Sequence, residues 1–147
     1  MWGRLGTGRM QPPAKLKHLA PYLARAHELD NRDPVVAYYC RYYAVQEAVK
    51  EHSKDKDHEV LAFLMALMDK MEADKKALAG NEAITQDIVG QAHVESFALK
   101  LFDYADQQDR AGKADKRIAR TFYSSSYIME VLKTFGELDA EVRCGVD

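Results

Sequence analysis

The chain has 147 residues, a formal net charge of -2 at pH 7 and 47% hydrophobic residues. This length suits one domain or two small fused bundles, and the charge gives no whole-molecule attraction to nucleic acid. Two cysteines, Cys40 and Cys144, are too few for a disulfide framework and favour a reducing compartment. No apolar run approaches the length of a membrane span, so direct membrane insertion is not expected.

Residues 1–14 predict a disordered leader, which Pro12 and Pro13 end. Beyond them, leucines and alanines at helical spacing predict a first helix from about Lys17 to Leu29. Because proline is tolerated only in the first turn of a helix, Pro21 indicates that the helix begins close to it.

The segment from Pro34 to about His52 gives the strongest helix signal. Asp33 is a capping residue, and Pro34 occupies the first helical position. The first half of this segment is apolar or aromatic on nearly every side, with Arg41 as its single charge. Such a helix must be surrounded by others, so we expect it at the centre of a three-helix module spanning residues 15–80. The third helix of this module is predicted from Asp57 to about Ala79.

Residues 81–147 predict a linker helix and a second module. Glu82 to Val89 could form a brief helix closed by Gly90, and the next helix is predicted over residues 91–107. A long helix follows over residues 113–135. We expect a further helix after Gly136 that is cut short. No segment alternates with the period of a strand, so the predicted fold is all-α.

An aromatic echo links the two halves. A shift of about 84 positions aligns three aromatic pairs: Tyr38 with Phe122, Tyr39 with Tyr123, and Tyr43 with Tyr127. This match is weak support for two related helical units. The inward positions expected in the second module include Val94, Phe97, Ala98, Leu101, Phe102, Ala105, Ile118, Phe122, Met129 and Leu132.

The sequence contains no recognisable catalytic or metal-binding grouping. None of the five histidines forms a His-Glu-x-x-His pair, and Cys40 has no local partner and is expected in the core. Ser124, Ser125 and Ser126 lie in mid-helix and are expected to let helices approach. We therefore predict no enzyme activity, no cofactor and no metal.

The third helix carries more apolar surface than a bundle needs. Leu61, Met65 and Met68 form a flank beside the inward stripe, Glu72 continues its line, and Asp69 lies at its edge. Apolar surface is costly unless covered, and methionine re-packs readily against partner helices. Either the first helix or the Glu82 segment covers this flank, or a partner helix does. The inward stripe comprises Val60, Phe63, Leu64, Leu67, Met71 and Leu78.

A basic face is predicted at the start of the long helix. Lys113, Lys116, Arg117 and Arg120 have the spacing of residues that share one helical face, with Arg110 just ahead. This is either an ordinary solvated face or a landing surface for an acidic segment. Positive charge near a helix start opposes the macrodipole, which slightly favours a binding role.

Four blocks of sequence resemble the LYST-interacting protein family, the Vps4-associated cofactors of the ESCRT pathway. They occur in family order, and the similarity covers about residues 16–141. The blocks are Arg32–Arg41, Asn81–Gln86, Asp106–Gly112 and Thr134–Leu138.

The resemblance implies two tandem microtubule-interacting-and-trafficking (MIT) three-helix modules, packed into one all-α domain of about six to seven helices. It also implies binding to C-terminal helical motifs of ESCRT-III subunits, the charged multivesicular body proteins. The family's ligand contact on the third helix falls on Leu67, Met68 and Asp69. The family's C-terminal domain, which dimerises and stimulates the AAA ATPase, is expected to be missing. Contact with the ATPase would require that domain, and this domain is expected to be monomeric.

The leading hypothesis is a non-enzymatic adaptor of ESCRT-III disassembly in multivesicular body sorting, cytoplasmic and recruited to endosomal membranes through ESCRT-III. A partner helix would lay leucines against Met65 and Met68, and its basic residues would meet Asp69 or Glu72. The alternative is a generic helical-repeat peptide-binding scaffold unrelated to ESCRT.

Overall fold

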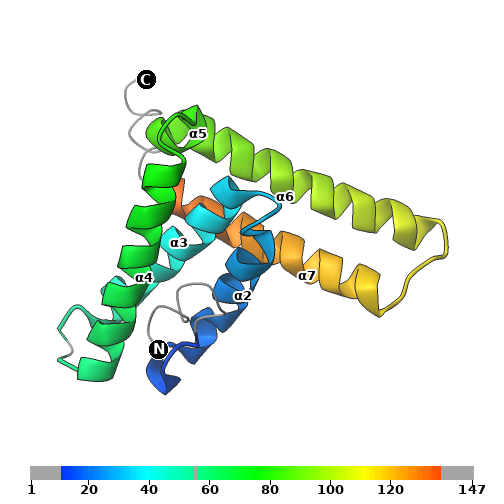
Figure 1. Cartoon of the computed structure of the whole chain (residues 1–147). Coiled ribbons are helices and arrows are strands. Elements are labelled where there is room, and N and C mark those ends of the chain that lie inside the picture. Colours follow the sequence, from blue (N-terminus) through cyan, green and yellow to red (C-terminus); the bar gives the residue numbers. More distant parts are fainter. Residues whose placement is uncertain (1–10, 55, 137–147) are drawn as a thin grey trace, which may run out of the picture. The chain divides into compact units, whose positions relative to one another are not determined.

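The computed structural model describes residues 11–54 and 56–136. All regular secondary structure within these ranges is helical (Figure 1), which confirms the predicted all-α fold. The chain divides into two compact units between Asn81 and Glu82. That each unit is an MIT-like module, and that the two pack into one domain, stays a prediction.

The first unit contains the 3-10 helix η1 (Ala14–Leu19) and the α-helices α2 (Ala20–Leu29), α3 (Pro34–His52) and α4 (His58–Ala77). The prediction of one helix from Lys17 was wrong, because η1 and α2 meet at Ala20. This boundary places Pro21 within the first turn of α2, where its missing N–H removes no intrahelical hydrogen bond.

Two aspartates set the starts of α3 and α4. Asp33 accepts a hydrogen bond from the backbone N–H of Val36 at 3.2 Å, and Asp57 accepts one from Glu59 at 2.9 Å. Lys15 Nζ lies 2.9 Å from the Asp57 carboxylate. The hydrogen bond from Lys15, with those from the backbone, lowers the pKa of Asp57. The predicted starts of these two helices, at Pro34 and Asp57, are confirmed to within one residue.

Helix α3 is the central helix of the first unit, since it packs against both α2 and α4. Its residues from Val35 to Arg41 are buried without a break. Cys40 is among them, and burial raises the pKa of its thiol to about 12, so it is a protonated core residue as expected. The core cluster shared by η1, α2, α3 and α4 consists of Leu16, Leu19, Leu23, Ala44, Ala48, Val60, Leu64 and Leu67.

A buried charge joins the helices of this unit. The side chain of Arg41 is only 5% exposed, and its guanidinium binds both oxygens of Asp30, at 2.7 and 2.8 Å. A second carboxylate, Asp74 of α4, lies 3.5 Å from Arg41 and also accepts a hydrogen bond from Lys70 at 2.8 Å. Burial alone would raise the pKa of Asp30, but the hydrogen bond and charge of Arg41 outweigh it, so the pKa is lowered.

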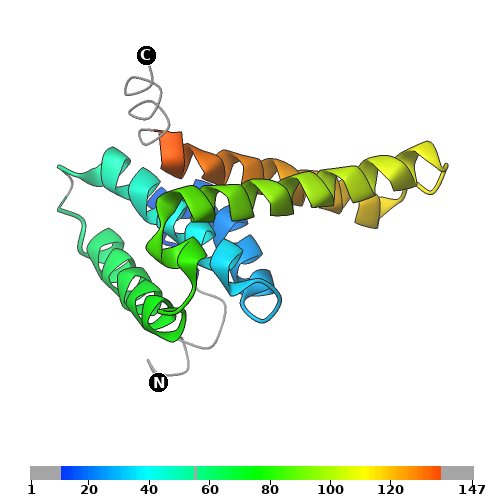
Figure 2. The same ribbon diagram turned by 90° about the horizontal axis from the view of Figure 1, so that it is seen from above.

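The second unit contains α5 (Glu82–Thr85), α6 (Asp87–Arg110), α7 (Lys116–Val131) and the 3-10 helix η2 (Leu132–Phe135). Figures 1 and 2 show α6 and α7 side by side, joined at one end by a short turn. The predicted helix boundary at Gly90 was wrong. The backbone is extended at Gln86, so the boundary between α5 and α6 lies there, and Gly90 is buried inside α6. Glycine inside a helix costs about 1 kcal/mol relative to alanine, which a helix of 24 residues tolerates.

The turn between α6 and α7 shortens the predicted long helix. Gly112 has a φ of 75°, and the N–H of Lys113 donates to the carbonyl of Gln108 at 2.9 Å, which closes α6 with a glycine cap. Asp115 then caps α7 by accepting a hydrogen bond from Ile118 at 3.0 Å. Lys113 therefore lies in the turn and not on α7, contrary to the prediction.

The core of the second unit runs between α6 and α7. Ser125, 1% exposed, donates a hydrogen bond to the carbonyl of Ala98 at 3.1 Å, so a small polar residue allows close approach, as expected. Phe102 was predicted to face inward but is 44% exposed, and its ring contacts Phe122. Tyr123 is 65% exposed, so the aromatic echo does not reproduce a buried position there. The predicted helix after Gly136 and most of the leader lie outside the described residues.

We predict that Asp30→Asn destabilises the first unit by about 2 kcal/mol at neutral pH, because the variant loses a charge-assisted bidentate pair. The pKa of Asp30 in the folded chain lies below its ordinary value of 3.8. Its stabilising contribution is therefore complete above pH 3.8 and is lost as the pH falls through the lowered pKa. Urea unfolding across a pH series measures this. As the pH falls into the acid range, the free energy of unfolding should decrease less for the variant than for the parent chain.

Glu28→Gln is the matched control for this measurement. Glu28 pairs with Arg25 at 2.8 Å, but the Glu28 side chain is 56% exposed. Exposed pairs contribute little, so this variant should stay within about 0.5 kcal/mol of the parent chain. Equal losses in the two variants would contradict the structural role assigned to the buried pair.

Candidate functional site

Helix α4 carries two stripes of side chains displaced by one residue. The inner stripe, Val60, Leu64, Leu67 and Met71, is 1–8% exposed and faces the core. One position further along, Leu61, Met65 and Met68 repeat this spacing but are 44%, 67% and 51% exposed. Successive residues of an α-helix are about 100° apart, so the second stripe points away from the core. We call Leu61, Met65 and Met68 the methionine face.

Two carboxylates extend the methionine face toward the end of α4. Asp69 follows Met65 by one helical turn, and Glu72 follows Met68 likewise; both are exposed. Within the described ranges, neither carboxylate forms an ion pair. Lys70, between them in sequence, is held elsewhere by Asp74 at 2.8 Å. The methionine face therefore has an acidic rim that is open to a basic partner group.

The methionine face is exposed in the structure. The interpretation that the first helix covers this flank was wrong, because α2 packs mainly against α3. Monomeric proteins rarely expose contiguous apolar surface without a function for it. The arrangement can hold an amphipathic helix, whose apolar side chains would lie against the flexible methionines.

The predicted basic residues lie around the turn between α6 and α7. Arg110 ends α6, Lys113 lies in the turn, and Lys116, Arg117 and Arg120 lie in the first two turns of α7. All five are exposed, and we call them the basic turn surface. The prediction that four of them share one helical face fails at Lys113, which precedes the helix.

Two members of the basic turn surface have acidic neighbours. Arg110 pairs with Asp106 at 3.1 Å, and Arg117 lies 3.6 Å from Asp115. The backbone hydrogen bond from Ile118, together with the charge of Arg117, lowers the pKa of Asp115. Arg117 thus contributes to the cap of α7, which makes it a poorer probe of partner binding than its neighbours.

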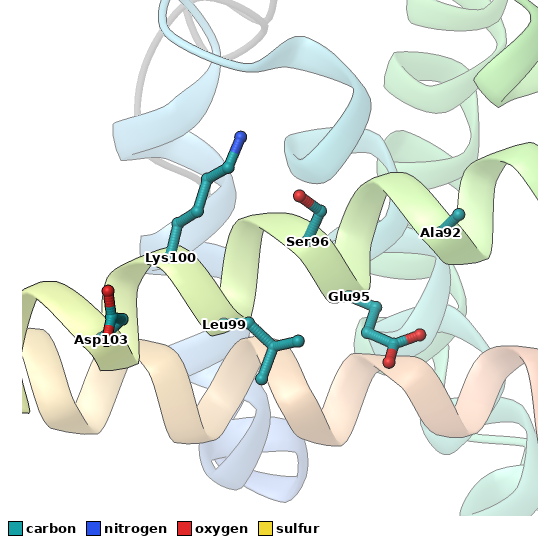
Figure 3. A pocket seen from close by; sticks show the side chains of 6 residues that line it. All are labelled: Ala92, Glu95, Ser96, Leu99, Lys100 and Asp103. Carbon is teal, nitrogen blue, oxygen red and sulfur yellow. The ribbon is translucent and has the colours of Figure 1, made fainter.

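The outer side of α6 has an open hollow. Figure 3 shows that its six lining side chains all come from successive turns of this one helix. A small-molecule site normally surrounds most of its ligand, and one helix provides a wall on one side only. The lining residues are Ala92, Glu95, Ser96, Leu99, Lys100 and Asp103.

The exposed apolar side chains of α6 were missed at the sequence level. Ile88 and Leu99 are 67% and 52% exposed and, with Phe102, fall on one helical stripe. α7 can cover only one side of α6, so a count of the apolar positions on all sides of this helix would have found them.

Within the described residues, no cluster of three or more His, Cys, Asp or Glu side chains could hold a metal ion. None of the helices in the same ranges is both long enough and apolar enough to cross a membrane. His18 instead bonds Glu51 at 2.8 Å, an exposed link between η1 and α3.

A protein-family model described as "Vta1 like" matches residues 18–145. The chain belongs to this family. It is 52% identical over 129 residues to the human vacuolar protein sorting-associated protein VTA1 homolog, covering 88% of this chain and 41% of the relative. It is 40% identical over 132 residues to the Arabidopsis thaliana homolog of mammalian LYST-interacting protein 5, covering 90% and 30%. These matches confirm the predicted family.

A fission-yeast relative extends the similarity further. The vacuolar protein sorting-associated protein vts1 of Schizosaccharomyces pombe is 33% identical over 119 residues, or 79% of this chain and 30% of the relative. The chain spans less than half the length of these relatives. Its similarity to them therefore concerns one part of longer proteins.

We predict that Leu67→Ala and Met65→Ala separate the two stripes of α4. Leu67 is 1% exposed and Met65 is 67% exposed. Truncating the buried leucine should cost about 2–5 kcal/mol of unfolding free energy, whereas the exposed methionine should cost less than about 0.5 kcal/mol. Urea denaturation measures both values. A large loss for Met65→Ala would show that the methionine face is part of the core.

Proposed function

We propose that this chain is a non-enzymatic adaptor domain of the ESCRT-III disassembly machinery that binds C-terminal helical motifs of ESCRT-III subunits in multivesicular body sorting. Two observations support the proposal: the chain belongs to a family whose members are named for vacuolar protein sorting, and α4 exposes the methionine face. The methionine face is the observation that carries it.

Partner recognition follows from the chemistry of α4. Leucines on one side of a partner helix lie against Met65 and Met68, which adapt their unbranched side chains to the partner's shape. Basic residues of the partner meet Asp69 and Glu72 at the rim. The acidic rim chiefly sets orientation and association rate, while desolvation of the methionine face supplies affinity.

The expected affinity is modest. A flexible tail must order itself when it forms a helix on the surface, and this ordering consumes part of the contact energy. A short groove-binding tail is therefore expected to bind with a dissociation constant on the order of micromolar, or about 8 kcal/mol.

The second candidate function is a generic helical-repeat scaffold that binds peptides unrelated to ESCRT. The same exposed apolar face would serve this function, so the two candidate functions differ in which peptides bind. Titration with C-terminal tail peptides of each ESCRT-III subunit, against scrambled peptides of equal composition, tests the proposal directly. Equal binding of native and scrambled tails would favour the generic scaffold.

The cellular setting is part of the proposal. A cytoplasmic adaptor of this kind reaches endosomal membranes through the ESCRT-III subunits it binds. Contact with the AAA ATPase of the pathway is not part of the role proposed for the described helices, and the domain they form acts as a monomer.

The basic turn surface is proposed as a second contact, for acidic tails of ESCRT-III subunits. Lys113, Lys116 and Arg120 form no ion pair within the described residues, so their charges are available to a partner. Apolar side chains that α6 leaves exposed, such as Leu99 and Phe102, would hold the captured tail.

We predict that Met68→Asp weakens binding of a groove-binding ESCRT-III tail at least about 30-fold while the fold remains intact. A carboxylate would replace an apolar contact that must be desolvated, and burying it costs several kcal/mol. Isothermal titration measures the affinity, and circular dichroism checks the fold. Ala77→Asp, at an exposed position of α4 on the side opposite Met68, is the matched control and should bind normally. Unchanged binding by Met68→Asp would place the groove elsewhere.

We predict that Lys116→Glu with Arg120→Glu slows association of an acidic tail at low salt, with a smaller effect near physiological salt. Exposed charges act mainly on the association rate, and salt screens them. Dissociation should change little. Stopped-flow kinetics across a salt series measures both rates. If the association rate at low salt is unaltered, the basic turn surface is only solvated.

A further inference from the structure

We infer that Met65 and Met68 form a redox-sensitive modification site, at which peroxide oxidation of the two thioethers releases a helix bound to the methionine face. The release rests on the proposed function, because it requires that this face bind a partner. The selective oxidation itself rests only on the geometry of α4.

Exposure separates these two methionines from the one that follows them. Met65 and Met68 are 67% and 51% exposed, whereas Met71 is 8% exposed and belongs to the inner stripe. All three lie within two turns of the same helix, so they share backbone conformation and local sequence. Their different access to solvent should therefore dominate their relative rates of oxidation.

The chemistry is a two-electron oxygen transfer from a peroxide. The methionine sulfur attacks one oxygen of hydrogen peroxide, a sulfur–oxygen bond forms, and the oxygen–oxygen bond breaks. The remaining oxygen leaves as water after taking up the proton, so methionine is oxidised to the sulfoxide and the peroxide is reduced. Methionine sulfoxide reductases, which draw electrons from a thiol reductant, reverse the change.

The consequence for binding follows from polarity. A sulfoxide replaces a soft apolar group with a strong dipole whose oxygen needs a hydrogen-bond donor. The leucines of an amphipathic partner offer no such donor, so docking would bury an unsatisfied acceptor. Asp69 and Glu72 add only further acceptors at the rim. Oxidation of the methionine face therefore opposes docking at two adjacent positions.

The fold is expected to survive this oxidation. Met65 and Met68 point to solvent, and the core below them is built from Leu64, Leu67 and Met71, which their oxidation leaves untouched. The switch is thus confined to the surface, and circular dichroism spectra of reduced and oxidised protein should coincide.

The experiment uses the full chain and dilute hydrogen peroxide. Peptide mapping by mass spectrometry should find Met65 and Met68 oxidised at least about five times faster than Met71. The oxidised protein should bind an ESCRT-III tail peptide at least tenfold more weakly, and treatment with the two sulfoxide reductases should restore the affinity. In Met65→Leu with Met68→Leu, the affinities measured before and after peroxide treatment should be equal, because the oxidisable thioethers are gone. The matched control is Met129→Leu on α7, which should lose affinity after peroxide as the parent chain does.

The outcomes separate this inference from the proposed function. Oxidation of Met71 at the rate of Met65 and Met68, or full affinity of the oxidised chain, would overturn the inference. Equal sensitivity of the double leucine variant to peroxide would also overturn it. Selective oxidation of the two exposed methionines in a chain that binds no tail would support the modification site but reject the proposed function.

Discussion

The first unit depends on one buried guanidinium. Arg41 reaches the carboxylate of Asp30 at 2.7 Å and that of Asp74 at 3.5 Å, which joins the end of α2 and the last turn of α4 to the centre of α3. A buried charge without partners would be strongly destabilising, so α4 must keep Asp74 inward. Met65 precedes Asp74 by nine residues, or about two and a half helical turns, so the two side chains lie on opposite sides of α4. The same ion pairs therefore hold the methionine face toward solvent.

This constraint explains how α4 serves both packing and recognition. Its inner stripe has valine, leucine and one methionine in the core, and its outer stripe has Leu61 and two exposed methionines with flexible side chains. A rigid helix that presents adaptable side chains suits the capture of several related amphipathic partners. The acidic rim adds a preference for basic residues, so shape is recognised loosely and charge more strictly.

Local signals in the sequence predicted most of the fold. Asp33 with Pro34, and Asp57 before a periodic run, marked helix starts to within one residue, and the two-stripe pattern located Leu61, Met65 and Met68. Partner binding by these residues stays a prediction. The wrong or missed predictions concern contacts between residues far apart in sequence, or positions where two local signals compete. Gly90 was overridden by packing along α6, Asp115 displaced the predicted start of α7 from Lys113, and the pairing of Arg41 with Asp30 requires knowing how helices pack.

The short turn from α6 to α7 also bears on how the chain folds. Gly112 ends one helix, and Asp115, three residues later, starts the next, so both boundaries are set by atoms close in sequence. Contacts near the turn then form with little loss of loop entropy, and packing can spread outward from it. Helical hairpins with such low contact order fold in microseconds to milliseconds. The second unit should therefore acquire its topology quickly, with few competing strand pairings that could trap it.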